Sequence, residues 1–230
     1  MHEDRAAAPA AGPAGVEGEH PAGAGTSTSA RGAWVGAAIS AAAFGVTTAL
    51  VTAHLTRGID RATGHLFRPD DDWGPTQLRF DHVVEGLRPE RLLILLAAAT
   101  VLATLLRRSW SPLVLVVPPV VVTACITWAV KVAVHRPDPN GGITDTGGSY
   151  PSGHMIALIV CGGLCVLLVR RTRWWLWCVV VALAGVMAVS LLVTTAHWLT
   201  DIVGGTFLGL AVIAATVATG ARRWASDQEP

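Results

Sequence analysis

The sequence predicts an all-α membrane protein, a bundle of six transmembrane helices. Of its 230 residues, 52% are hydrophobic and only 14% are charged. The apolar residues gather into blocks of about 16 to 23, and a helix of that length crosses roughly 30 Å of hydrocarbon. The net charge of +1 provides no strong field for attracting nucleic acid. A polytopic membrane protein without a nucleic-acid partner is therefore expected.

The chain divides into three parts by composition. Residues 1–30 are rich in Ala, Gly, Pro, Ser and Thr, and they contain too little apolar surface to offset the entropy of ordering, so a disordered tail is expected there. Residues 31–223 hold all the apolar blocks and form the predicted six-span membrane domain. Residues 224–230 are left as a short cytoplasmic tail.

The apolar blocks place the spans in order along the chain. The expected spans are 33–53, 91–106, 112–134, 154–169, 174–195 and 198–219. Between the first two spans, the polar segment 54–90 is predicted to be a loop with one or two helical turns on the membrane surface. The four cysteines all fall inside apolar blocks without the spacing of metal ligands, and we interpret them as small packing residues.

Basic clusters give the orientation of the bundle. Lys and Arg are enriched in cytoplasmic loops, and compact clusters occur at 107–108, 170–173 and 222–223, after spans two, four and six. Both termini are therefore predicted to be cytoplasmic. His154 and His197 then fall together on the extracytoplasmic face.

The connection between the third and fourth spans carries residues suited to an anion. Lys131 and Arg136 lie near the end of the third span, and Ser152 and Gly153 stand where the next helix begins. A helix start exposes unpaired backbone N–H groups and the positive end of the helix dipole. Together these groups suit a phosphate. Taken singly, Lys131 could instead extend toward the interface and Ser152 could simply cap the helix.

The junction before the sixth span carries a histidine and a carboxylate. His197 and Asp201 are four residues apart, which puts them on one face of a helix. A carboxylate that accepts a hydrogen bond from one imidazole nitrogen leaves the other nitrogen free as a nucleophile or base. Asp201 lies just inside a membrane helix, where an unpartnered carboxylate is expensive. This pair is therefore a candidate catalytic pair.

These residues resemble the type 2 phosphatidic acid phosphatase (PAP2) superfamily. The family pattern is K-x6-RP, then PSGH, then SR-x5-H-x3-D, on six transmembrane helices. In this chain PSGH stands complete at 151–154, and Ser190, His197 and Asp201 follow with the family spacing. The resemblance covers about residues 91–215, and motif order, spacing and topology all agree with it.

The resemblance implies a reaction and a role for each residue. It implies that His197 attacks phosphorus to form a phosphohistidine, that Asp201 orients His197, and that His154 protonates the leaving oxygen and later activates water. It implies hydrolysis without a metal ion or other cofactor. The groups implied to bind the phosphate are Lys131, Arg136, Ser152 and the N–H of Gly153.

Two positions depart from the family pattern. Asp138 stands where the arginine of the first motif is expected, and Leu191 stands where the arginine after Ser190 is expected. We expect Arg136 to take over part of the missing charge, and Asp138 to turn away from the phosphate or to pair with Arg136. His135 and Tyr150 are weaker candidates, for substrate contact and for bracing the loop.

The leading hypothesis is a phosphatase of the cell membrane that acts on the extracytoplasmic face. Its partner would be a lipid monophosphate or diphosphate such as undecaprenyl diphosphate or phosphatidate. The alternative is a non-catalytic membrane protein that binds anionic lipid through Lys131 and Arg136, and a transporter has weaker support. The sequence indicates neither the lipid nor the oligomeric state.

Overall fold

The computed structural model describes residues 24–68, 73–143, 147–169 and 174–219, and these residues form eight helices and no strand. The two ends of the chain, residues 1–23 and 220–230, lie outside the described residues. The helices are α1 (Ala24–Thr52), α2 (Arg57–Phe67), α3 (Pro75–Gly86), α4 (Pro89–Arg107), α5 (Ser111–Val134), α6 (Gly153–Leu168), α7 (Trp174–Val193) and α8 (Leu199–Ala218).

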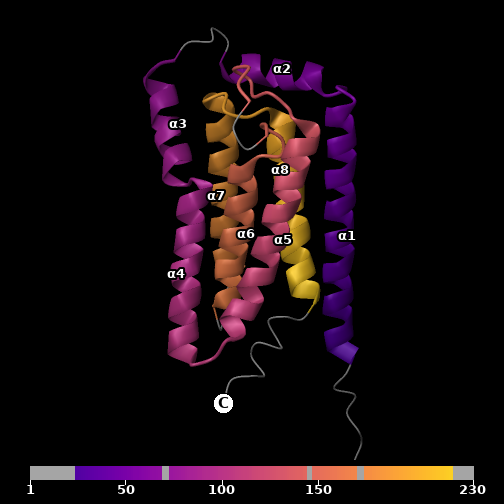
Figure 1. The fold of residues 1–230 in the computed structure, drawn as a ribbon, viewed down its shortest axis with the longest axis vertical. Coiled ribbons are helices and arrows are strands. Elements are labelled where there is room, and N and C mark those ends of the chain that lie inside the picture. Colours follow the sequence, from indigo (N-terminus) through magenta and orange to yellow (C-terminus); the bar gives the residue numbers. More distant parts are fainter. Residues whose placement is uncertain (1–23, 69–72, 144–146, 170–173, 220–230) are drawn as a thin grey trace, which may run out of the picture.

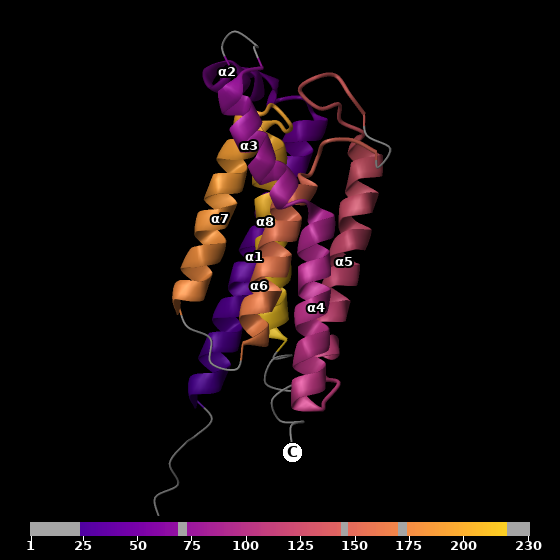
Figure 2. The same ribbon diagram turned by 90° about the vertical axis from the view of Figure 1, so that its left-hand side faces the viewer.

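Helices α1, α4, α5, α6, α7 and α8 run along the long axis of the molecule, while α2 lies across one end (Figure 1). Helix α3 stands beside the end of α7 and leads into α4 (Figure 2). Five membrane-length apolar helical stretches are present among the described residues, and α6 is a shorter apolar helix of 16 residues. The prediction of an all-helical membrane protein is therefore confirmed, and the bounds of α4 to α8 lie within two residues of the predicted spans.

Helices α6 and α8 form the centre of the bundle. Eleven residues of the 16 in α6 are buried, whereas large apolar side chains on the outer helices remain exposed. Examples are Leu95 and Leu106 of α4 and Val181 of α7, at 63%, 76% and 70% exposure. Such an extensive apolar exterior is compatible with lipid as the surrounding solvent.

Close packing of α8 on α6 depends on glycine. A Cβ atom on Gly205 would come within 2.7 Å of the backbone oxygen of Ser152, and one on Gly209 within 2.9 Å of Ile159 Cβ. Small residues four apart on a helix let two backbones approach. The sequence contains this spacing in "GTFLG" at 205–209.

The substitution Gly205→Ala is expected to destabilise the bundle by about 1–3 kcal/mol, because the new methyl group meets backbone that cannot move aside. Thermal unfolding of the purified protein in detergent measures the effect. Gly185→Ala on α7 is the matched control, since a Cβ there meets nothing within 4 Å. A melting temperature equally unaffected by both changes would contradict the packing argument.

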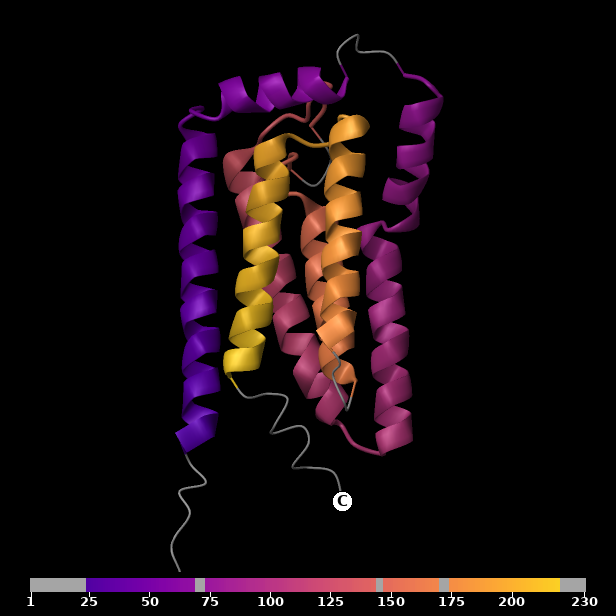
Figure 3. The ribbon, with the colours of Figure 1, turned by 180° about the vertical axis from the view of Figure 1, so that it is seen from behind.

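The connections that carry the candidate residues gather at one end of the bundle. The loops after α1, α5 and α7 lie at the end crossed by α2, while α1 begins and α8 ends at the opposite end (Figures 1 and 3). Arg107, from the first predicted cytoplasmic cluster, also lies at that opposite end, where its side chain donates to the Leu168 carbonyl. The other two clusters, at 170–173 and 222–223, lie outside the described residues.

Two expectations about the N-terminal third were wrong. Residues 24–30 belong to α1 rather than to a disordered tail, because a span that has already formed extends its helix at little cost. The segment 54–90 contains two helices of 11 and 12 residues rather than one or two turns. Tertiary contacts of α2 with α7 and α8, and of α3 with α7, explain why these polar segments are helical.

Candidate active site

The two motif histidines come together at the end of the bundle beneath α2. His154 is the second residue of α6, and His197 lies in the turn before α8. Their ring centroids are 6.0 Å apart with an interplanar angle of 72°. The Ser152 N–H donates to the backbone oxygen of Asp201 at 3.0 Å, which joins the two motifs directly. The structure therefore brings together the histidines that the sequence placed on one face.

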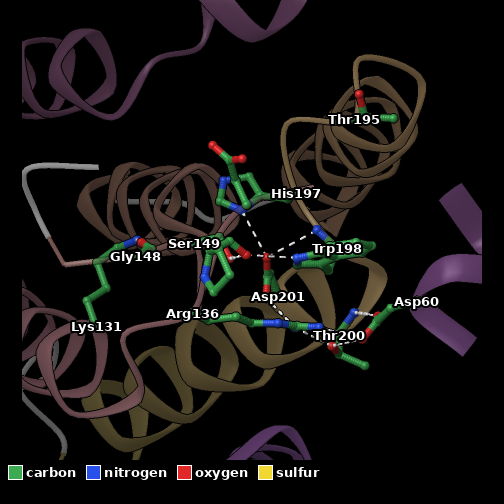
Figure 4. Close-up of polar contacts among 12 residues, drawn as sticks. Asp60, Lys131, Arg136, Gly148, Ser149, Thr195, His197, Trp198, Thr200 and Asp201 are labelled. Carbon is green, nitrogen blue, oxygen red and sulfur yellow. Dashed lines mark hydrogen bonds and ion pairs between the residues drawn. The ribbon is translucent and has the colours of Figure 1, made fainter. Parts of the chain in front are cut away.

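Asp201 is fully buried and contacts several groups at once (Figure 4). Its Oδ2 lies 3.4 Å from Nδ1 of His197 and accepts a hydrogen bond from the backbone N–H of Trp198 at 3.1 Å. Its Oδ1 accepts one from Nη1 of Arg136 at 2.7 Å. The predicted His197–Asp201 pair is thus present as a long contact, and Nε2 of His197 is left for another partner.

Arg136 is held between two carboxylates. Its Nη1 contacts Asp201, and its Nη2 contacts Oδ2 of Asp60 at 2.6 Å. Its guanidinium carbon also lies 5.4 Å from the centroid of the Trp198 ring. The sequence predicted Arg136 as a phosphate ligand, and the geometry instead directs its terminal nitrogens to protein carboxylates.

Sequence reasoning missed Asp60. It lies on α2, 2% exposed, and its two oxygens accept hydrogen bonds from the backbone and hydroxyl of Thr200 at 3.0 and 2.9 Å. The partners are 140 positions apart, and no motif or spacing relates them. The one sequence signal is a carboxylate within a short amphipathic segment, which is too common to mark a site.

Lys131 is hydrogen-bonded to the loop that connects α5 to α6. Its Nζ donates to the backbone oxygen of Gly148 at 2.6 Å. Gly148 has a φ of +129°, and a Cβ atom there would lie 2.7 Å from the oxygen of Arg136, so only glycine fits this close approach. The loop is thereby folded against the end of α5, and the N–H of Ser149 donates to the backbone oxygen of Arg136 at 2.8 Å.

One cavity of about 620 Å³ connects the polar site to the apolar interior. Its polar end includes Lys131, His154 and His197 together with Gly153. Its other walls are mainly apolar residues of three helices, among them Leu93 of α4, Val120 of α5, and Ile156, Ala157 and Val160 of α6, although Arg88 and Glu90 also line it. Ser152 and Arg136 do not line it. A molecule with an anionic head and an apolar tail matches this division.

Ser152 occupies the N-cap position of α6 without acting as a side-chain cap. Its Oγ is buried and has no hydrogen-bond partner among the described residues, and the same holds for Nε2 of His154. Buried polar atoms normally have hydrogen-bond partners. Two such atoms in one motif, with no partner among the described residues, indicate a role other than packing.

The two departures from the family pattern have structural explanations. Oδ1 of Asp138 accepts hydrogen bonds from the backbone of Asn140 and Gly142 at 2.9 and 2.8 Å, which closes a local turn. Asp138 nevertheless lines the cavity, and the ion pairs of Arg136 are with Asp60 and Asp201. Leu191 is fully buried in the apolar core, where an arginine head group would lack water.

Tyr150 braces the loop, as predicted. Its hydroxyl is 2.8 Å from Thr48 Oγ1 of α1, and its ring stacks on Phe44 with centroids 6.3 Å apart. Burial raises the pKa of Tyr150 to about 12, so the hydroxyl stays protonated. His135 ends α5 in a left-handed conformation with φ of 45° and is exposed.

The fold and the paired histidines define a polytopic membrane protein with a histidine-based site. A family model for the PAP2 superfamily matches residues 41–225, and the chain belongs to that superfamily. A similar solved structure is the transmembrane PAP2 type phosphatidylglycerolphosphate phosphatase from Bacillus subtilis, with a TM-score of 0.70 and 14% identity. The match covers 80% of this chain and 95% of that one. No match is found among curated proteins.

Proposed function

We propose that this protein hydrolyses a phosphate monoester or diphosphate of a membrane lipid through a phosphohistidine intermediate. The observation that carries the proposal is that one cavity has His154 and His197 at one end and mainly apolar walls from α4, α5 and α6 at the other. The lipid tail would lie along these walls while its phosphate reaches the histidines. Membership of the PAP2 superfamily supports the phosphatase class.

In the proposed first step, Nε2 of His197 attacks phosphorus and the bond between phosphorus and the lipid oxygen breaks. His154 donates a proton to that oxygen, and the lipid leaves as an alcohol or, from a diphosphate, as a monophosphate. In the second step, His154 takes a proton from water, and the resulting hydroxide attacks the phosphohistidine. The P–N bond then breaks to release inorganic phosphate. Asp201 orients His197 throughout.

Lys131 and the N–H of Gly153 are the proposed phosphate ligands, since both residues line the cavity and α6 begins there. Ser152 remains a proposed ligand because its buried hydroxyl lacks a partner among the described residues, although contact requires the loop to shift. For Arg136 we propose a positioning role in place of the phosphate contact predicted from the sequence.

We further propose that the protein has six spans, namely the five membrane-length stretches and the shorter helix α6, and that its active site is extracytoplasmic. Helix α6 is short, but protein rather than lipid surrounds it, so its length need not match the bilayer. The arginines at 107–108 support a cytoplasmic location for the opposite end of the bundle.

The alternative, a non-catalytic protein that binds anionic lipid, is weakened by the contacts of Arg136, one of its two proposed cations. The guanidinium of Arg136 is paired with the carboxylates of Asp60 and Asp201. Binding without turnover also gives no reason to place two histidines 6.0 Å apart in one cavity.

The proposal predicts release of inorganic phosphate by the purified protein in mixed micelles. The substrate panel pairs monophosphates with diphosphates: phosphatidate, phosphatidylglycerolphosphate, and undecaprenyl monophosphate and diphosphate. Because no step requires a metal ion, activity is expected to persist in excess EDTA. A soluble phosphate ester without a tail is the control and should react more slowly, since it forfeits the binding energy of the apolar walls. No release from any lipid would contradict the proposed function.

A further inference from the structure

We propose that Asp60, on the helix that crosses the end of the bundle, is a positioning residue for the nucleophile. Through Arg136 it keeps the carboxylate of Asp201 available to His197. The inference rests on the proposed function and adds to it a residue from outside all three family motifs. It also explains why Arg136 faces away from the cavity.

Asp60 is bound tightly enough to act as a fixed group. Its carboxylate accepts from the N–H and Oγ1 of Thr200 and from Nη2 of Arg136, at 3.0, 2.9 and 2.6 Å. Burying a carboxylate costs several kcal/mol unless such partners compensate it. Because Thr200 is the second residue of α8, these contacts also hold the first turn of α8 under α2.

Arg136 connects Asp60 to the nucleophile pair. Its Nη1 donates to Oδ1 of Asp201 at 2.7 Å and to Oγ1 of Thr200 at 2.8 Å, while its Nη2 contacts Asp60 (Figure 4). The guanidinium therefore lies between two buried carboxylates. The 3.4 Å contact of Asp201 with His197 lies at the far end of this chain of contacts.

The electrostatic consequence follows from counting charges. Two carboxylates and one guanidinium carry a net charge of −1, so Asp201 keeps negative charge toward His197. If Asp60 were neutral, the guanidinium would be balanced by Asp201 alone, and Asp201 would be drawn away from His197. Charged groups interact strongly at such distances when water is excluded. Since the His197 contact is already long, it is the contact that would be lost first.

Asp60→Asn tests this role because it removes the charge and keeps the size of the side chain. We expect kcat to fall by about tenfold, as a less well oriented general base or nucleophile loses rate. KM should stay within about twofold, because Asp60, Arg136 and Asp201 do not line the cavity. Asp60→Glu should restore most of kcat. The matched control is Asp81→Asn, which removes a partly exposed carboxylate from α3 and should leave both constants unchanged.

A second pair of variants distinguishes an effect of Asp60 on kcat that acts through Arg136 from a general effect on folding. In an Arg136→Gln background, Asp60→Asn should cause no further loss of kcat, since the residue through which it acts is gone. Additive losses would overturn the proposal. If Asp60→Asn does not fold, Arg136→Lys replaces it, because an ammonium lacks the two-pronged geometry that spans both carboxylates. Wild-type kcat in that variant would overturn the proposal too.

A spectroscopic measurement works without any activity. In protein labelled with 15N-histidine, the His197 ring should favour the tautomer with its proton on Nδ1, and Asp60→Asn should shift it toward a mixture of both. His197→Ala identifies the signal. An unchanged spectrum overturns the Asp60 proposal whether or not the protein is active. Conversely, an active wild type with an unaffected Asp60→Asn variant disproves only the positioning role, and an inactive wild type disproves only the proposed function.

Discussion

The substitution His197→Ala is expected to lower phosphate release by at least about 10⁴-fold, because it removes the atom that forms the bond to phosphorus. Rapid-quench experiments with a lipid carrying labelled phosphate measure the intermediate directly. The wild type should acquire label that survives alkali and is lost in acid, as a phosphohistidine does. The variant should acquire none.

The control for this experiment is His135→Ala. His135 is an exposed histidine at the end of α5 and does not line the cavity. It should retain wild-type labelling and turnover, which shows that loss of a histidine near this end of the bundle is not itself harmful. Labelled protein in the His197→Ala variant would place the covalent step on another residue and refute the proposed nucleophile.

The second large effect is expected for His154→Ala. Loss of a general acid typically costs about 10²–10⁴-fold, and the loss should depend on the leaving group. A lipid alkoxide needs a proton as it departs, whereas a nitrophenolate departs readily without one. Turnover of p-nitrophenyl phosphate should therefore fall far less than turnover of the lipid substrate. Parallel assays of both substrates measure the difference.

Equal losses for both substrates would contradict the proposed acid role of His154. A comparison variant is Ser149→Ala, which alters a buried hydroxyl that lines the same cavity and donates to the oxygen of Pro137 at 3.2 Å. It perturbs the cavity wall without removing a titratable group, so any loss it causes should be the same for the two substrates.

Much of the fold was predictable because membrane helices are encoded locally. Apolar block length determined each span, and the predicted 112–134 and 154–169 differ from α5 and α6 by one residue at most at each end. The spacing of four also predicted the contact between His197 and Asp201, although His197 lies in the turn before α8 rather than on the helix itself. Topology alone then put His154 at the same end.

The parts that escaped prediction depend on contacts between distant segments. Asp60 and Thr200 are 140 positions apart, and nothing periodic links them. The role of Arg136 could not be assigned either, because a cation beside a phosphate motif suggests phosphate binding until its buried carboxylate partners are known. Helices α2 and α3 were underestimated for the same reason, since their polar sequences acquire helical structure through packing on α7 and α8.

The pairing of the first long helix with the last has a consequence for biogenesis. Helix α1 packs along α8, and α6 is buried against α8, so a helix that is synthesised after both supplies the partner surface for both. Until α8 inserts, α1 lacks the helix along which it packs, and His197 lacks the carboxylate of Asp201. The candidate site is therefore completed only once α8 is in place, and a chain terminated before residue 199 loses the α8 contacts of α1 as well as Asp201.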